Sequence, residues 1–327
     1  ALPTGPSEML QRTPLVAAVL ALCISADAFS VAPSLAKLGG SATRLSATSR
    51  AQPALAPSAR RAGRAQAAHV RMQLAQSAAA TLSASQASTV GMLKQVRSME
   101  PKGYPAEQGF ASFSVAGGQG TMEAYEAPGK QNIAWCSSLN VVAPSLAVSS
   151  LTVWCGPLKE VPHMCTRTVV TDASVDLFID FRPRAYAAYE TRLPDGTYGE
   201  PTSREWFGFK SARDEFERQF FSEGVAAWAN AYRSQGTPKA PPKGDDALYS
   251  GPLRIDVSLP AGDASVQLAA NACKEAAAIW ADWMDKTEPL PAGMRVTSTY
   301  AYDTKMRAQM FGVLANTYTN LFGDQGR

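Results

Sequence analysis

The stretch that decides the fold is VPHMCTRTVVTDASVDLFIDFRPR, residues 161–184. Its second half alternates in side-chain character: Val175, Leu177, Ile179 and Phe181 share one parity, and Ser174, Asp176, Phe178 and Asp180 share the other. A period of two is typical of a β-strand. Asp172-Ala173, flanked by Thr and Ser, predicts a short turn. The stretch is therefore expected to form an antiparallel hairpin.

The pairing of Thr171 with Ser174 would place Arg167 opposite Phe178, diagonal to Asp176 and Asp180. One face of the hairpin is then apolar and should pack on helices; it consists of Met164, Val170, Val175, Leu177, Ile179 and Phe181. The other face carries His163, Cys165, Arg167, Asp176, Asp180 and Arg182 around Phe178. A polar sheet face of this kind is either solvated or lines a pocket, and the pattern leaves both open.

The N-terminal region reads as a targeting sequence in two parts. Residues 14–28 form an apolar run of signal-peptide length, too short to span a membrane. Between Asp27 and Glu100 there is no acidic residue but there are nine Lys or Arg in a background rich in Ala and Ser, which is transit-peptide chemistry. We therefore expect a signal peptide at 1–28, a plastid transit peptide at 29–75 and a folded domain at 76–327.

This arrangement is typical of algae with secondary plastids, and it predicts a mature protein in the plastid stroma with no membrane span. A secreted protein with a low-complexity linker is the alternative. Of the 31 basic and 28 acidic residues, the first 99 positions hold ten and two, which leaves 21 against 26. The basic balance thus belongs to the N-terminal region, and it is no argument for nucleic-acid binding.

The remaining chain alternates strands and helices in a way that predicts an α+β fold. We expect an α/β/α sandwich, with one central antiparallel sheet flanked by helices on both faces. The expected strands are 120–125, 133–142, 147–155 and 253–259, and the expected helices are 90–96, 204–233, 266–284 and 303–322. Gly236 to Asp246 should be a loop, and Asp263 or Ser265 should cap the third helix.

The sequence contains no motif that predicts a metal site or a nucleotide-binding site. Cys136, Cys155, Cys165 and Cys273 show no CxxC spacing, and His163 is the one histidine after the N-terminal region, so no zinc or iron–sulfur site is expected. No GxGxxG follows a predicted strand, and there is no P-loop.

The order of several short motifs resembles a known family. A Trp-Cys strand, a Val-Pro-His strand, the sequence FIDF followed by Arg-Pro-Arg, a Leu-Tyr-Ser-Gly-Pro segment, a Trp-rich helix and a terminal helix with Lys-Met-Arg and Met-Phe-Gly occur in that order. Over roughly Tyr125 to Asp324 the chain resembles the ferredoxin-dependent bilin reductase superfamily. Within it, the chain is most similar to red chlorophyll catabolite reductase.

The resemblance implies a plastid reductase of a linear tetrapyrrole, either red chlorophyll catabolite or a related bilin. Reduced ferredoxin would supply single electrons, with no bound flavin, nicotinamide or metal, and acidic side chains would protonate radical intermediates. The alternative on the same fold is a non-catalytic tetrapyrrole-binding protein or lyase, or a structural subunit of a plastid complex.

Two departures from the family pattern bear on the chemistry. The family's catalytic carboxylate falls at Arg167, and an arginine cannot deliver a proton at neutral pH. The histidine that bilin reductases carry on the preceding strand has no counterpart between Ala147 and Cys155. A second family acid is matched by Asp303, offset by about one position.

Asp303 and His163 are therefore the candidate catalytic residues. Asp303 could donate a proton or cap a helix. His163 titrates in a useful range but could be structural.

The candidate substrate-binding residues are Arg167, Cys165, Asp176, Phe178, Asp180 and Arg182. Arg167 and Arg182 suit tetrapyrrole carboxylates, as does Arg184 unless it is solvated. Asp176 and Asp180 could donate protons unless they are ion-paired with Arg167. Cys165 could add to a vinyl group or be a buried thiol. The sequence does not decide between these alternatives.

We predict that residues 1 to about 75 are absent from the mature protein, because an acid-free segment rich in Ala, Ser and Arg buries too little apolar surface to fold. N-terminal sequencing of the protein from isolated plastids should start between about residues 60 and 90. A mature chain that retains Leu15 to Leu22 would contradict the prediction.

Overall fold

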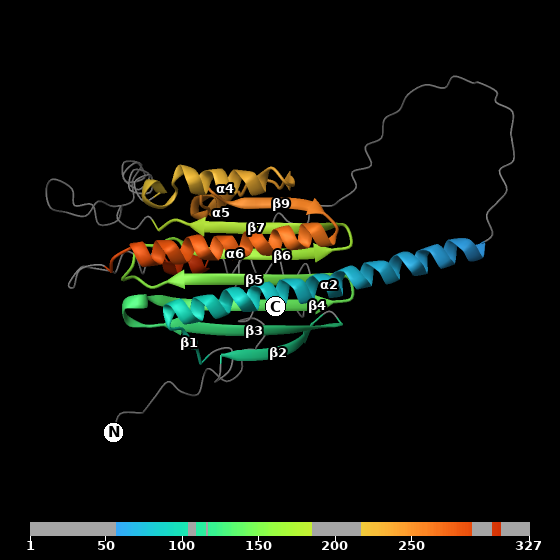
Figure 1. Ribbon diagram of the computed structural model, residues 1–327, viewed down its shortest axis with the longest axis horizontal. Coiled ribbons are helices and arrows are strands. Elements are labelled where there is room, and N and C mark those ends of the chain that lie inside the picture. The colour runs from blue at the N-terminus through green and yellow to red at the C-terminus, as the bar shows by residue number, and fades with distance from the viewer. Residues whose placement is uncertain (1–56, 104–108, 116, 185–216, 290–302, 309–327) are drawn as a thin grey trace, which may run out of the picture.

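The computed structural model describes residues 57–103, 109–115, 117–184, 217–289 and 303–308, with side chains from Leu74 onward except at positions 130, 244, 245 and 248. Its centre is one antiparallel sheet of nine strands within these ranges, in the order β1-β3-β4-β5-β6-β7-β9-β8, with β2 also paired to β3 (Figure 1). The strands are β1 (Glu100–Pro101), β2 (Phe110–Val115), β3 (Gly118–Ala127), β4 (Ile133–Ala143), β5 (Leu146–Cys155), β6 (His163–Thr171), β7 (Ser174–Arg182), β8 (Thr237–Pro238) and β9 (Ile255–Pro260). A short 3-10 turn, η2 (Gly129–Gln131), joins β3 to β4.

The central hairpin of β6 and β7 has the predicted register. Arg167 is opposite Phe178, and Val170 is opposite Val175. The backbone N–H groups of Ala173 and Ser174 donate to the Thr171 hydroxyl oxygen at 3.3 and 3.2 Å, which holds the two-residue turn. The prediction for this stretch is confirmed.

Three helices cover the apolar face of the sheet, as Figure 1 shows: α2 (Pro57–Arg97), α4 (Glu223–Arg233) and α6 (Asp263–Lys286). The apolar side chains of β6 and β7 form one buried core with Leu93 of α2, Trp280 of α6 and Ala229 of α4. The expected helix at 90–96 is thus the end of a much longer helix. It runs across the expected boundary between residues 75 and 76.

Helix α6 lies close to the sheet because small residues line its inner side. Ala269, Ala272 and Ala276 are fully buried, and the Trp280 indole N–H donates to the Pro162 carbonyl oxygen at 2.9 Å. The helix begins at Asp263, and its N-cap is Gly262 rather than Asp263 or Ser265, so the expected cap was wrong.

The second face of the sheet meets α5 (Gly244–Tyr249) and the helical residues 303–308, which contribute Asp246 and Asp303 to contacts with that face. A second apolar cluster, centred on Met122, Leu139 and Val169, is also buried there. Helices therefore pack around both faces of one antiparallel sheet, and the predicted α+β fold class is confirmed.

Other boundaries differ from the expectations. The helix expected at 204–233 is interrupted at Ser222, whose hydroxyl accepts from the Val225 N–H at 3.4 Å and caps α4. Its first part, 204–216, lies outside the described residues, as do the positions after 308 of the final expected helix. The expected loop at 236–246 contains β8 and the start of α5, and β1 and β2 were not predicted.

Within the described ranges, no helix is both long enough and apolar enough to cross a bilayer.

Candidate functional site

A buried chain of three ionisable groups lies on the second face of the sheet. Asp303 accepts from the Arg184 guanidinium at 2.7 Å through one carboxylate oxygen and at 3.3 Å through the other. The His163 ring lies on the other side, with Nε2 at 2.9 Å from Asp303 Oδ1. All three side chains are at most 7 % exposed. The two residues predicted from the sequence to be catalytic are thus in direct contact.

The hydrogen bonds of His163 fix its tautomer. The Cys155 backbone N–H donates to Nδ1 at 3.0 Å, so Nδ1 carries no proton and Nε2–H donates to Asp303. Burial lowers the pKa of His163 to about 4, although Asp303 opposes the shift. The ring also lies 4.5 Å from the ring of Trp154, centroid to centroid. His163 is therefore neutral near pH 7.

Burial alone would raise the pKa of Asp303, but Arg184 and then His163 outweigh it, and the pKa lies below its usual value. The resting carboxyl is therefore ionised. Its Oδ1 accepts from His163 of β6, and its Oδ2 accepts from Arg184, which follows β7. The expected alternative, in which Asp303 serves only as a helix cap, does not account for these contacts.

A second ionic cluster follows on β7. Asp180 accepts from the Gly251 N–H at 2.9 Å and lies 3.2 Å from Arg182 Nε. Arg182 also donates to Asp246 at 2.9 Å, and Asp246 accepts from Arg254 at 2.8 Å. Burial raises the pKa of Asp180, against the opposing effects of Arg182 and Arg254. Asp180 and Asp303 are thus two buried carboxyls on one sheet face with pKa values shifted in opposite directions.

Two arginines contact the ring of Phe178. The guanidinium carbons of Arg167 and Arg254 are each 4.9 Å from the centroid of its ring, a cation–π distance. Arg167 is 1 % exposed, so its side of the sheet is not solvated. Of the two interpretations of the polar face, a solvated surface is excluded at this position.

The remaining candidate substrate-binding residues, Cys165 and Asp176, lie on the same face of the sheet but have different partners. Cys165 is buried and opposite Asp180, whereas Asp176 is 2.7 Å from Lys239 and accepts from Ser258. The ion pair suggested for Arg167 with Asp176 or Asp180 was wrong, because these carboxylates bind Lys239 and Arg182 instead.

The solvated alternative for Arg184 is excluded. Arg184 is 1 % exposed, and besides binding Asp303 it donates to the Lys159 carbonyl oxygen at 2.6 Å. Asp246 and Arg254 were missed entirely. The one sequence feature near them is the Leu-Tyr-Ser-Gly-Pro segment that lies between them. That segment does not indicate that the two flanking charged residues form an ion pair.

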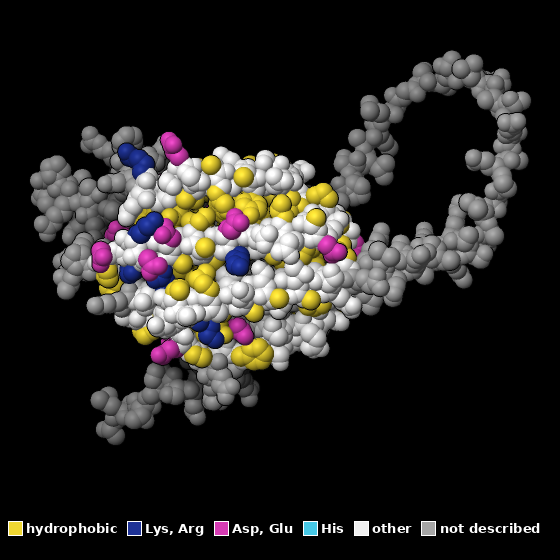
Figure 2. Space-filling view, in the orientation of Figure 1, with side chains coloured by type: hydrophobic (Ala, Val, Ile, Leu, Met, Phe, Trp, Pro, Cys, Tyr) yellow, Lys and Arg dark blue, Asp and Glu magenta, His cyan; other side chains and the backbone are white. Residues whose placement is uncertain are grey.

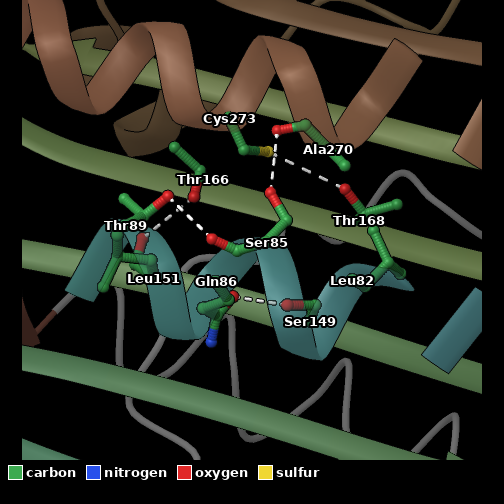
Figure 3. Close-up of a pocket in the computed structure, with 10 residues that line it drawn as sticks. All are labelled: Leu82, Ser85, Gln86, Thr89, Ser149, Leu151, Thr166, Thr168, Ala270 and Cys273. Carbon is green, nitrogen blue, oxygen red and sulfur yellow. Dashed lines mark hydrogen bonds between the residues drawn. The ribbon is translucent and has the colours of Figure 1, made fainter. Parts of the chain in front are cut away.

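A small cavity on the opposite face is not a substrate site. It lies between α2, α6 and the sheet, and Ser85, Gln86, Thr168 and Cys273 are among its lining residues (Figure 3). Its volume of about 20 Å³ has room for one water molecule. Figure 2 views this helix-covered side, where Lys and Arg are interspersed with Asp and Glu rather than gathered by sign.

Among the residues that the structure describes, no three His, Cys, Asp or Glu side chains are grouped as a metal site requires.

Comparison with solved structures shows a likeness in fold. No family model matches the sequence, and no curated protein matches it. The fold is similar to that of phytochromobilin synthase from tomato, solved in complex with biliverdin, with a TM-score of 0.55 and 12 % sequence identity. The match covers 72 % of this chain and 75 % of that one. At this identity the likeness establishes a shared fold.

We predict that acid destabilises the protein through His163. Its pKa of about 4 in the folded state is below the ~6.5 of an unfolded histidine, so the unfolded chain binds the proton first as the pH falls. Its contribution to stability is complete above about pH 6.5 and decreases toward pH 4, by about 2 kcal/mol at pH 5. Asp303 adds a further loss only below about pH 4, because its folded pKa is also depressed.

Urea unfolding at pH 7, 6 and 5 measures this effect. The His163→Gln variant cannot titrate, and its free energy of unfolding should fall less between pH 7 and pH 5 than that of the wild type. Parallel pH profiles of the two proteins would contradict the assignment.

Proposed function

We propose that this chain reduces a linear tetrapyrrole with single electrons supplied by a protein donor. The observation that carries the proposal is the buried Arg184–Asp303–His163 chain on one face of the sheet. The fold that holds it is shared with a phytochromobilin synthase whose crystal structure contains biliverdin. A neutral His hydrogen-bonded to an ionised Asp is a proton-handling pair that needs no metal ligand set.

Asp303 and His163 have a definite role in this chemistry. Reduction of one double bond takes two electrons and two protons. When the first electron arrives, the tetrapyrrole becomes an anion, and its negative charge raises the proton affinity of nearby groups. The Asp303–His163 pair then takes up a proton that it does not hold at rest and passes it to the substrate.

Asp180 is the second proton source in the proposal. Its raised pKa contrasts with the lowered pKa of Asp303, and such a divergence is typical of sites where two carboxyls have different roles. It lies two residues from Arg182, which is opposite His163 on β6. Two protonation positions on one sheet face would serve the two steps of the reduction.

Arg167 takes the place of the family's acid and has a different task. It cannot protonate a radical anion, but a guanidinium in a water-poor site stabilises one and binds a carboxylate or carbonyl oxygen. Arg182 and Phe178 would complete the contact surface, with Cys165 and Asp176 at its margins. The 1 % exposure of Arg167 supports this role because its charge acts at low effective dielectric constant.

The finer proposal is a plastid reductase acting on red chlorophyll catabolite or a related bilin, with reduced ferredoxin as donor. It is supported by the acid-free, Ala- and Ser-rich N-terminal region and by the order of motifs along the chain.

Anaerobic incubation of the purified chain with reduced ferredoxin and, separately, biliverdin and red chlorophyll catabolite tests the proposal. Absorbance spectra should show loss of the substrate band and growth of a product band. Saturable tetrapyrrole binding without turnover would instead favour the non-catalytic binding protein, and the absence of both would reject the tetrapyrrole function.

We predict that Asp303→Asn lowers turnover by about 10²–10⁴-fold, the range for loss of general acid–base catalysis, while tetrapyrrole affinity changes less than threefold. The amide keeps the shape of the carboxyl but holds no transferable proton. A radical intermediate should accumulate, detectable by electron paramagnetic resonance. Asp282→Asn, on the exposed side of α6, is the matched control. Unchanged turnover in Asp303→Asn would refute the assignment.

We further predict that Arg167→Ala weakens tetrapyrrole binding by about 1.5–3 kcal/mol, the range for a hydrogen bond to a charged group. Fluorescence quenching measures the dissociation constant, with the exposed Arg218→Ala as control. Arg167→Glu restores the family acid and should alter the rate or the product stereochemistry while binding persists. An affinity of Arg167→Ala within error of the wild type would remove Arg167 from the site.

A further inference from the structure

A cavity of about 230 Å³ opens at the edge of the sheet, beside β8, β9 and the residue that follows α5. In Figure 1 this edge is where α5 and β9 lie next to β7. Ligand pockets usually measure about 300–1,000 Å³, so this one is too small for a whole tetrapyrrole. Its size suits a small molecule or one arm of a larger one.

Most of the residues that line the cavity are of two kinds, apolar and cationic. Its walls are apolar and come from Pro238, Ala240, Pro241, Pro242 and Val257. Cationic side chains also line it, namely Arg233, Lys239 and Arg254. An apolar stem that ends in a negatively charged group would match both parts.

Arg233 has a positive charge that no carboxylate neutralises by direct contact. Its three hydrogen bonds all go to neutral oxygens, at 2.9 Å to the Arg254 carbonyl, 2.7 Å to the Pro252 carbonyl and 2.9 Å to the Asn230 side chain. A guanidinium has five N–H donors, so two remain. Among the described residues, none places a carboxylate within 4.0 Å of Arg233.

Arg254 has a buried donor that is not used. Its Nη1 donates to Asp246 and Ser250, and its Nη2 donates to Asp256 at 2.7 Å. The Nε of the same side chain is buried with no hydrogen-bond partner in the described structure. Because that nitrogen is itself buried, it does not face the cavity, and the Arg254 guanidinium is committed to the carboxylates of Asp246 and Asp256.

The carboxylates near the cavity are already committed. Asp256 lines it but binds Arg254, and Asp176 binds Lys239 at 2.7 Å. Among the described residues that line the cavity, Arg233 is therefore the cation without a direct ion pair. An anionic oxygen would match its charge and use its two remaining N–H donors.

We propose that this cavity binds a carboxylate carried on an apolar stem, with Arg233 as the charge partner. The carboxylate has two conceivable sources: a free small organic acid or a side arm of the tetrapyrrole. The second source rests on the proposed function, and it is sterically reasonable because Arg254 also contacts Phe178 on the candidate substrate face.

Calorimetric titration of the full chain with benzoate, and with the neutral isostere benzamide, tests the site without any tetrapyrrole. Benzoate should bind saturably and benzamide at least tenfold more weakly. Arg233→Gln should weaken benzoate binding at least tenfold, whereas Arg218→Gln, outside the cavity, should leave it unchanged. Equal binding of the two ligands, absence of saturable benzoate binding, or an unaffected Arg233→Gln variant would overturn the proposal.

A second variant tests the site independently, in case the Arg233→Gln variant does not fold. Ala240→Trp fills the cavity from its exposed wall, leaves the arginines intact and should also abolish benzoate binding. The two sources are separated by competition: biliverdin should displace benzoate if a tetrapyrrole arm enters, and biliverdin dimethyl ester should not. If both forms leave benzoate binding unchanged, the site takes a free acid, whatever the fate of the proposed reductase activity.

Discussion

The structure depends on one constraint: the central strands are buried on both faces, so strand alternation decides which side chains must find polar partners. On β6 and β7 one parity is apolar and packs on α2 and α6. The other parity carries His163, Asp180 and Arg182, each at most 2 % exposed. Burying a charge without a partner costs several kcal/mol, so every one of these groups has to be matched from elsewhere in the chain.

The matching groups come from segments remote in sequence. Asp303 lies 140 residues after His163, and Asp246 lies 64 residues after Arg182. Because removal of either partner leaves a buried charge, these contacts fix where α5 and residues 303–308 sit on the sheet. The same contacts set the pKa shifts, downward for Asp303 and upward for Asp180. Folding and candidate chemistry therefore share one set of residues.

The contrast between local patterns and contacts remote in sequence explains which features could be predicted from the sequence. The register of Arg167 against Phe178 follows from a local period of two and a short turn, and α6 follows from apolar spacing along a single segment. The partners of Asp303 and Asp180 could not be predicted in this way, because a charge pair across the sheet leaves no periodic pattern in the sequence. The break at Ser222 was hidden for a different reason: apolar residues continue on both sides of it, while the cap itself is a single hydroxyl.

Arg167 shows how the electrostatics of such a face limit its chemistry. The guanidinium of Arg167 places a permanent cation against Phe178, with Arg254 on the same ring. Cations lower the pKa of neighbouring carboxyls, and at rest this opposes proton storage on Asp303. Added negative charge reverses the balance, because it attracts protons to the same carboxyls and is itself stabilised by the arginines. A face rich in paired arginines is thus suited to respond to an arriving electron.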